Sequence, residues 1–102
     1  MVNKKDDSLF RITKSSGFQI KFKNGYTVSV QFGPGNYCEN HDMDWDIPMT
    51  ATFLESKDAE VAIINKNGEF ISIDAWGEDQ VAGYYTPKMV LNLLQFVEKL
   101  RD

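Results

Sequence analysis

The sequence contains little cysteine, proline or histidine, and it has no long apolar run. Its 102 residues include one Cys, three Pro and one His. Because a single Cys cannot form an internal disulfide, we expect a reducing compartment, the cytosol. No apolar run approaches the ~20 residues of a membrane-spanning helix, and the charged N-terminus MVNKKDDSLFR lacks the apolar stretch of a secretory signal. We therefore expect no contact with a membrane.

Positive charge is scarce beyond the first third of the chain. Residues 1–32 contain six Lys or Arg and two Asp or Glu, whereas residues 33–102 contain five and thirteen, so that the net charge is −4. Nucleic-acid binding requires clustered Lys and Arg against the phosphates, so we expect no general nucleic-acid binding. An acidic surface fits a basic protein surface instead, although acidity by itself also favours solubility.

The tripeptide Lys-Asn-Gly occurs at 23–25 and at 66–68, and each copy separates two strand-like runs. The first pair of runs alternates apolar and polar residues, which predicts a hairpin with one polar face and a peripheral place in the sheet. The second pair is apolar on both faces, so we expect a central hairpin. In both hairpins, a three-residue loop places the apolar side chains of the two strands on the same face. The third loop position, which is Gly in each copy, then has the left-handed conformation of a G1 bulge. The predicted registers are Phe18 opposite Val30 and Ile20 opposite Val28, and Ile63 opposite Ile71 and Val61 opposite Ile73.

The C-terminal segment predicts a helix. Thr86 can cap it, Pro87 suits its first position, and the apolar residues that follow have helical spacing. A further strand is expected at Gln80–Tyr85, and the segment 1–16 either adds a short strand at 10–13 or is loosely ordered. The chain thus predicts one α+β domain over residues 1–102, a mostly antiparallel sheet of four to five strands with one C-terminal helix packed on one face. The helical stripe comprises Met89, Val90, Leu93, Leu94, Val97 and Leu100.

The connection from Gly33 to Asp58 is longer than a compact domain needs, unless it has structure or function of its own. A short element is expected near Met49–Leu54. Its part up to Asp46 also concentrates the single Cys, the single His, four carboxylates and a Trp. We interpret it as a binding surface, joined by the second acidic connection at 74–79. The candidate binding residues are Tyr37, Cys38, Asn40, His41, Asp42, Asp44, Trp45 and Trp76.

Catalytic chemistry in this connection is less well supported than binding. Cys38 and His41 are close in sequence, but the acidic residues around them disfavour a thiolate. Pro34 removes a backbone donor from the Gly-Pro-Gly-Asn turn, and no Lys follows to complete a phosphate-binding loop. We expect no catalytic residue and no cofactor, so a Cys-dependent enzyme is a minor alternative.

A metal site is also disfavoured. Asp42, Asp44 and Asp46 occupy alternate positions, as the carboxylates of calcium loops do. Those loops require a Gly at the sharp turn and a distal Glu at a set spacing, whereas here Pro48 follows and the Gly is missing. We therefore expect no metal, and a metal-dependent enzyme is likewise a minor alternative.

Several motifs resemble those of one protein family. The order GF-x-I-x-F-x-NG-x-x-VSVQ-x-G-x-G-x-YC-x-N spans Gly17 to Asn40, AE-x-A-I…NG spans Ala59 to Gly68, and G-x-x-TP-x-x-V spans Gly83–Val90. The pattern covers most of the chain and is similar to a family of small uncharacterised bacteriophage and prophage proteins. The resemblance implies an accessory protein of the host cytosol that inhibits or redirects a host factor, sometimes a defence system. It assigns no catalytic residue.

Two functions from different classes follow. The first is a non-enzymatic protein that binds a host protein through the acidic, Trp-bearing loops at 39–46 and 74–79, which would form one acidic surface if they converge. The alternative is a module that binds or sequesters a nucleotide-like ligand in a pocket with Tyr37, Asn40 and Trp45. A loop that projects from the sheet would favour the partner, and a loop folded over a cavity would favour the ligand. The edge of the first hairpin would also allow homo-oligomers.

Overall fold

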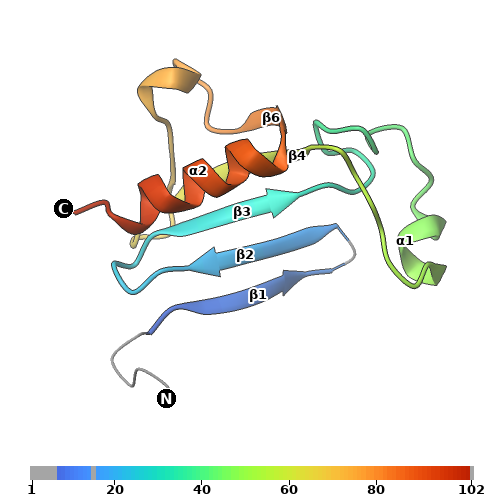
Figure 1. Cartoon of the computed structure of the whole chain (residues 1–102), viewed down its shortest axis with the longest axis horizontal. Coiled ribbons are helices and arrows are strands. Elements are labelled where there is room, and N and C mark those ends of the chain that lie inside the picture. The colour runs from blue at the N-terminus through green and yellow to red at the C-terminus, as the bar shows by residue number, and fades with distance from the viewer. Residues whose placement is uncertain (1–6, 15, 102) are drawn as a thin grey trace.

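The structure is a computed structural model that describes residues 7–14 and 16–101. The chain forms a six-stranded antiparallel sheet in which five strands have the order β1-β2-β3-β4-β5 and β6 pairs with β4. Helix α2 lies on one face of this sheet (Figure 1). The strands are β1 (Leu9–Thr13), β2 (Gly17–Lys21), β3 (Thr27–Gln31), β4 (Ala59–Ile64), β5 (Phe70–Ile71) and β6 (Ala82–Tyr85). The helices are α1 (Asp46–Thr50), the 3₁₀ turn η1 (Asp74–Trp76) and α2 (Pro87–Glu98). The α+β class and the packed C-terminal helix are therefore confirmed.

The N-terminal segment contributes to the sheet. The strand expected at 10–13 is confirmed, because β1 pairs with β2 along its whole length. The loose order considered for the same segment is wrong there, while residues 1–6 and 15 lie outside the described residues. Together with β6, this strand makes the sheet one strand larger than the widest expectation.

The first hairpin has the predicted register, with Phe18 opposite Val30 and Ile20 opposite Val28. Gly25 has a φ of +93°, the left-handed conformation that the three-residue loop requires. The expected peripheral position is wrong, however, because β2 pairs with β1 and β3 pairs with β4. The free edge available for self-association is therefore β1 and not an edge of this hairpin. Strand neighbours on both sides also bury the small polar residues Thr27 and Ser29.

The second hairpin departs from the predicted pairing. Ile63 lies opposite Ile71 as expected, but Val61 pairs with Ala82 of β6 and not with Ile73. Strand β5 ends at Ile71, and the chain then turns through η1, which places Trp76 in the core. Strand β6 occupies the edge of β4 that is left open. Burial of a large aromatic side chain thus shortens the hairpin, and β5 lies at the sheet edge and not at its centre.

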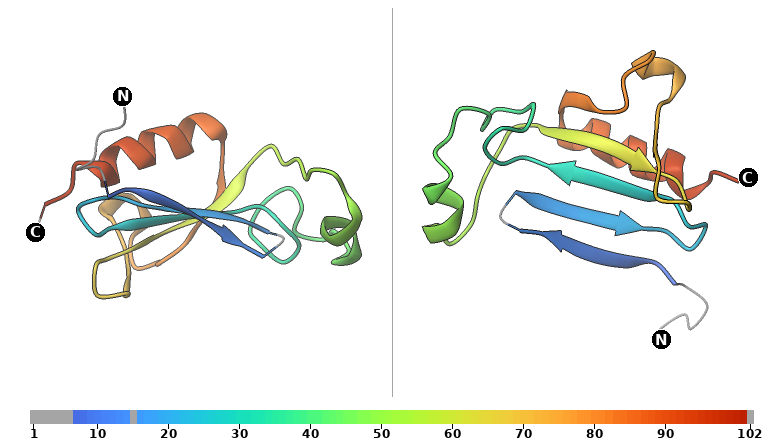
Figure 2. Two further views of the ribbon diagram at one scale, coloured as in Figure 1. Left: turned by 90° about the horizontal axis from the view of Figure 1, so that it is seen from below. Right: turned by 180° about the vertical axis from the view of Figure 1, so that it is seen from behind.

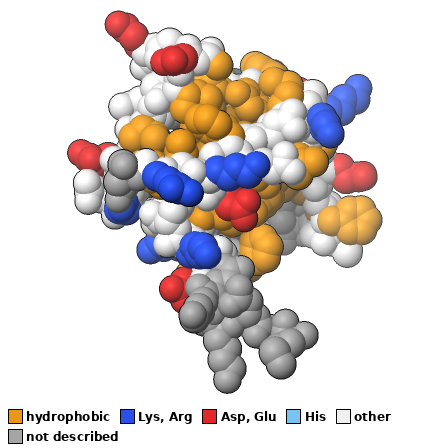
Figure 3. All heavy atoms as spheres, turned by 60° about the vertical axis from the view of Figure 1, so that its left-hand side comes forward, with side chains coloured by type: hydrophobic (Ala, Val, Ile, Leu, Met, Phe, Trp, Pro, Cys, Tyr) orange, Lys and Arg blue, Asp and Glu red, His pale blue; other side chains and the backbone are white. Residues whose placement is uncertain are grey.

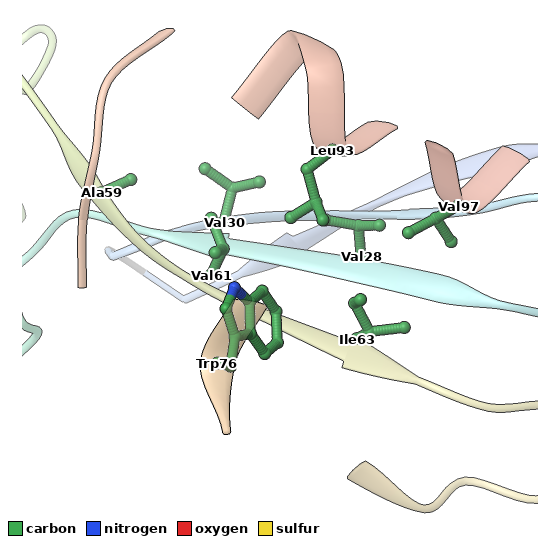
Figure 4. Packing of buried hydrophobic residues seen from close by; sticks show 8 residues of the cluster. All are labelled: Val28, Val30, Ala59, Val61, Ile63, Trp76, Leu93 and Val97. Atoms are coloured by element: carbon green, nitrogen blue, oxygen red, sulfur yellow. The ribbon is translucent and has the colours of Figure 1, made fainter. Parts of the chain in front are cut away.

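Helix α2 begins where the sequence predicts. The Thr86 hydroxyl accepts the N–H of Met89 at 3.3 Å, and Pro87 occupies the first turn. The helix packs mainly on β3, β4 and β6, with Leu93 and Val97 directed towards the sheet (Figure 4). The buried cluster comprises Val28, Val30, Ala59, Val61, Ile63, Trp76, Leu93 and Val97.

The turn of the first hairpin holds the C-terminal end of α2. The side-chain amide of Asn24 donates to the carbonyl oxygens of Val97 at 2.9 Å, Glu98 at 3.2 Å and Leu100 at 3.0 Å. The last carbonyls of a helix lack the usual partner one turn further along, and Asn24 supplies a donor to them. The Val97 oxygen also accepts the Leu100 N–H at 3.1 Å. A turn residue therefore caps α2 near Val97, which lies 73 residues further along the chain.

Replacing Asn24 by alanine should lower the free energy of unfolding by about 2 kcal/mol, because the helix end loses its donors and the turn loses an acceptor for the Tyr26 N–H. Urea unfolding of the variant and the wild type measures the loss. Asn67→Ala is the matched control, since Asn67 is the exposed equivalent in the second Lys-Asn-Gly copy. Equal losses in the two variants would contradict a capping role for Asn24.

Candidate functional site

The long connection projects beyond the ends of the strands. Figures 1 and 2 show α1 and its flanking chain set apart from α2, on the far side of the loop that leaves β3. We call residues 42–53 the arm. The short element expected at 49–54 is α1, which instead covers Asp46–Thr50. Of the two courses considered for this connection, the arm takes the projecting one, whereas residues 54–58 line a hollow of about 460 Å³ between the sheet and α2.

Two of the candidate binding residues hold the base of the connection together from within. The buried Asn40 donates through its side-chain amide to the carbonyl oxygens of Phe32 at 2.8 Å and Glu55 at 2.9 Å. The buried Cys38 directs its Sγ to the Gly33 carbonyl oxygen at 3.7 Å. Their placement on a binding surface is therefore corrected, because both side chains are occupied by the chain's own backbone.

Acidic side chains at the base of the connection also accept hydrogen bonds from backbone N–H groups. Asp58 Oδ1 accepts the Glu39 N–H at 2.7 Å, and Glu39 Oε1 accepts the Lys57 N–H at 3.0 Å. Glu60 Oε2 accepts the Tyr37 N–H at 3.3 Å. These bonds tie both ends of the connection to the start of β4. Part of its acidity thus has a structural role, and the arm is held at a fixed root.

His41 and Cys38 have different partners. The His41 ring stacks on Tyr37 with centroids 6.0 Å apart, and its Nδ1 lies 3.0 Å from Asp42 Oδ1. Neither side-chain contact joins the two residues, although the His41 N–H donates to the Cys38 carbonyl oxygen at 3.1 Å. Within residues 7–14 and 16–101, no group of three or more His, Cys, Asp and Glu side chains is arranged to hold a metal ion.

The arm itself exposes apolar and acidic side chains together. Trp45 is 63% exposed, Met49 74% and Phe53 75%. Asp42, Asp44 and Asp46 are also exposed, and residues 42–53 contain no Lys or Arg. Large apolar side chains that remain in water on a projecting segment are typical of a surface that another molecule covers. Contacts join the candidate residues Tyr37, His41 and Asp42, whereas Asp42, Asp44 and Trp45 are exposed together on the arm.

Trp76 lies apart from the arm and belongs to the core. Its Nε1 donates to the Tyr85 hydroxyl at 2.8 Å, and the two rings meet edge to face with centroids 6.2 Å apart. The turn that carries Trp76 lies at the upper left of Figure 1, whereas the arm lies at the right, beyond the ends of the strands. The condition that the two Trp-bearing loops converge is therefore not met, because the apolar Trp76 packs in the core whereas Trp45 is exposed on the arm.

The pocket expected for a nucleotide-like ligand is not formed by its three candidate residues. Tyr37 lines an open groove near Trp76, whereas Asn40 and Trp45 do not line it. The side-chain amide of Asn40 is already bonded to the backbone at the base of the connection. Tyr37, Asn40 and Trp45 are close in sequence, which suggested one pocket. In the structure, Tyr37 lines the groove, Asn40 is buried and Trp45 is exposed on the arm.

Comparison with known protein families, curated proteins and solved structures finds no match to this chain. The resemblance to bacteriophage proteins therefore rests on its motifs alone. Among the described residues, no helix is long and apolar enough to cross a membrane.

Proposed function

We propose that this protein is a non-enzymatic binding protein whose arm docks on a basic surface of a partner protein. The observation that carries the proposal is the projection of exposed Trp45, Met49 and Phe53 beside three aspartates. The described core is complete without these side chains, since none of them belongs to the buried cluster or packs against it. A partner could therefore cover Trp45 and Phe53 without disturbing the sheet or α2.

The composition of the arm suits a protein partner. A partly exposed Trp offers a large rigid contact area and is among the residues that dominate binding energy at protein interfaces. Aspartates around it accelerate encounter with a basic surface and disfavour acidic competitors. The hydrogen-bonded root at Asn40, Asp58 and Glu60 limits the conformational freedom that the arm would lose on binding.

The class of partner follows from the resemblance to bacteriophage accessory proteins, which implies a host protein in the host cytosol. The partner surface should be rich in Lys and Arg and should contain an apolar depression for Trp45. We propose no reaction at this surface, because Cys38 is buried and the exposed carboxylates of the arm surround no His other than His41.

Substitution of the arm should abolish capture of the partner without loss of stability. In pull-downs quantified by mass spectrometry, Trp45→Ala with Phe53→Ala should reduce recovery of the partner at least about tenfold, as expected for anchor residues. Because both side chains are exposed, the Tm of the variant should match that of the wild type.

The charged part of the arm is tested separately. The triple change of Asp42, Asp44 and Asp46 to Asn should slow association and remove its dependence on salt. Phe10→Ala is the matched control for an exposed aromatic residue outside the arm. Capture of the partner by both arm variants at the wild-type level would reject this surface.

A further inference from the structure

A second surface lies between the turn η1, strand β6 and the N-terminal half of α2. It is an open groove of about 870 Å³, and a hollow of about 260 Å³ that shares Tyr85 and Met89 continues it along α2 to Phe96. Figure 3 shows apolar side chains gathered in the upper part of this face, with acidic side chains above them. We call this surface the tyrosine groove. The lining used below comprises Tyr37, Trp76, Asp79, Tyr84, Tyr85 and Met89.

The backbone conformation of Tyr84 is unusual. Its φ is +58°, in the left-handed region that side chains with a Cβ disfavour. The ring is 57% exposed, so burial of the ring does not offset the strain. Lys14 is the other described non-glycine residue with positive φ, but it lies in the tight turn between β1 and β2, where such a conformation is common. Strain that supports an exposed aromatic ring is typical of a binding site.

The surrounding backbone fixes the position of Tyr84. Its N–H donates to the Tyr37 carbonyl oxygen at 2.9 Å. A Cβ on the preceding residue, Gly83, would lie 2.7 Å from the Tyr37 Cβ, so only glycine allows the two segments to approach this closely. Two chain segments distant in sequence thereby present their exposed tyrosines, Tyr37 and Tyr84, to one groove.

The charge of the groove selects its ligand. Asp79 lines it, and the exposed Asp74 and Glu78 lie in the same turn. None of the described residues that line the groove is Lys or Arg; Lys88, which precedes Met89, is not part of the lining. Aromatic faces attract cations, and a carboxylate pairs with a guanidinium through two parallel hydrogen bonds. An anionic ligand would be repelled here.

We propose that the tyrosine groove binds an arginine side chain within a basic segment of a partner protein. The planar guanidinium would stack on Tyr84 or on the face of Tyr37 that His41 does not cover, and it would pair with Asp79. Neighbouring apolar side chains would follow the hollow along α2 towards Phe96. The proposal goes beyond the arm, because the two surfaces have no named residue in common and can be tested independently.

NMR titration of the ¹⁵N-labelled protein with two capped tripeptides tests whether binding requires the positive charge of the arginine side chain. Acetyl-Gly-Arg-Gly-amide should shift the backbone amides of Tyr37, Asp79, Gly83 and Tyr84 with an affinity in the millimolar range, as suits one side chain. Acetyl-Gly-citrulline-Gly-amide has nearly the same shape without the charge and should bind at least about tenfold more weakly. Equal shifts with both peptides, or shifts confined to residues 42–53, would overturn the proposal.

Tyr84→Gly separates binding from folding. Glycine tolerates positive φ, so the Tm should rise or remain unchanged while arginine-peptide affinity falls at least about tenfold. Lys14→Gly is the matched control, because it relieves the same conformation at a distance and should leave the affinity unchanged. Wild-type affinity in Tyr84→Gly would refute the site.

Asp79→Asn is the second variant, because it removes only a charge from an exposed residue. The affinity for the arginine peptide should fall severalfold, with the Tm unchanged. If Tyr84→Gly proves less stable than the wild type, this variant decides alone, and full retention of affinity would reject the groove. The arm variants should bind the peptide as the wild type does, so failure of the groove and failure of the arm remain distinguishable.

Discussion

Replacing Ile63 by alanine is expected to lower the free energy of unfolding by about 3 to 4 kcal/mol, because the surrounding side chains cannot close the space that is left. Ile63 is 0% exposed and lies in β4, opposite Val28 of β3 and Ile71 of β5. It also belongs to the cluster that Leu93 of α2 completes (Figure 4). The loss would therefore loosen contacts among three strands and the helix.

Ile12→Ala is the matched control for this change. Ile12 is also in a strand, but it is 86% exposed on the edge strand β1. Its loss should change the unfolding free energy by less than about 0.5 kcal/mol. Urea unfolding measures both variants, provided that the dependence of the unfolding free energy on urea concentration is the same as in the wild type. Comparable losses at the two positions would mean that Ile63 is not packed as the structure shows.

Replacing Gly17 by alanine should destabilise the protein by about 3 kcal/mol or more, for a different reason. A Cβ at this position would overlap the Val30 carbonyl oxygen and lie 2.9 Å from the Gln31 Cα. Both are backbone atoms of β3, so no side-chain rotation can relieve the clash. The start of β2 would have to move away from its neighbour, which would break the pairing of Gly17 with Gln31.

Gly68→Ala distinguishes steric conflict from conformational strain. Gly68 has a φ of +84°, and a Cβ added there would meet no atom within 4 Å beyond its chain neighbours, so alanine should cost only about 1 kcal/mol. Thermal unfolding of the two variants provides the comparison. A harmless Gly17→Ala, or one no worse than Gly68→Ala, would contradict the close approach of β2 to β3.

Several elements could be predicted from local sequence because local chemistry controls them. The alternation around the first Lys-Asn-Gly copy fixed a register in which Phe18 lies opposite Val30, since any one-residue slip would bury polar side chains. Thr86 and Pro87 defined the start of α2, because a cap acts on donors within one turn. In each case the deciding interaction spans only a few residues, or repeats along a strand.

The candidate site could be predicted only in part. The sequence located an acidic connection with an exposed Trp45, because length and composition are visible without coordinates. It could not distinguish Asn40 and Cys38, which face inwards, from Asp42 and Asp44, which face water. Inward or outward orientation in an irregular segment has no sequence period, and it depends on which backbone groups need partners.

The sequence by itself therefore determined the α+β class, the hairpin turns and the start of the C-terminal helix, all of which follow from short-range periodicity and capping. Tertiary structure alone decided that Asn24 caps α2, that Trp76 turns into the core and that Tyr84 meets Tyr37 at an open groove. These contacts join segments far apart in the chain. They form because packing brings together groups that no local pattern relates.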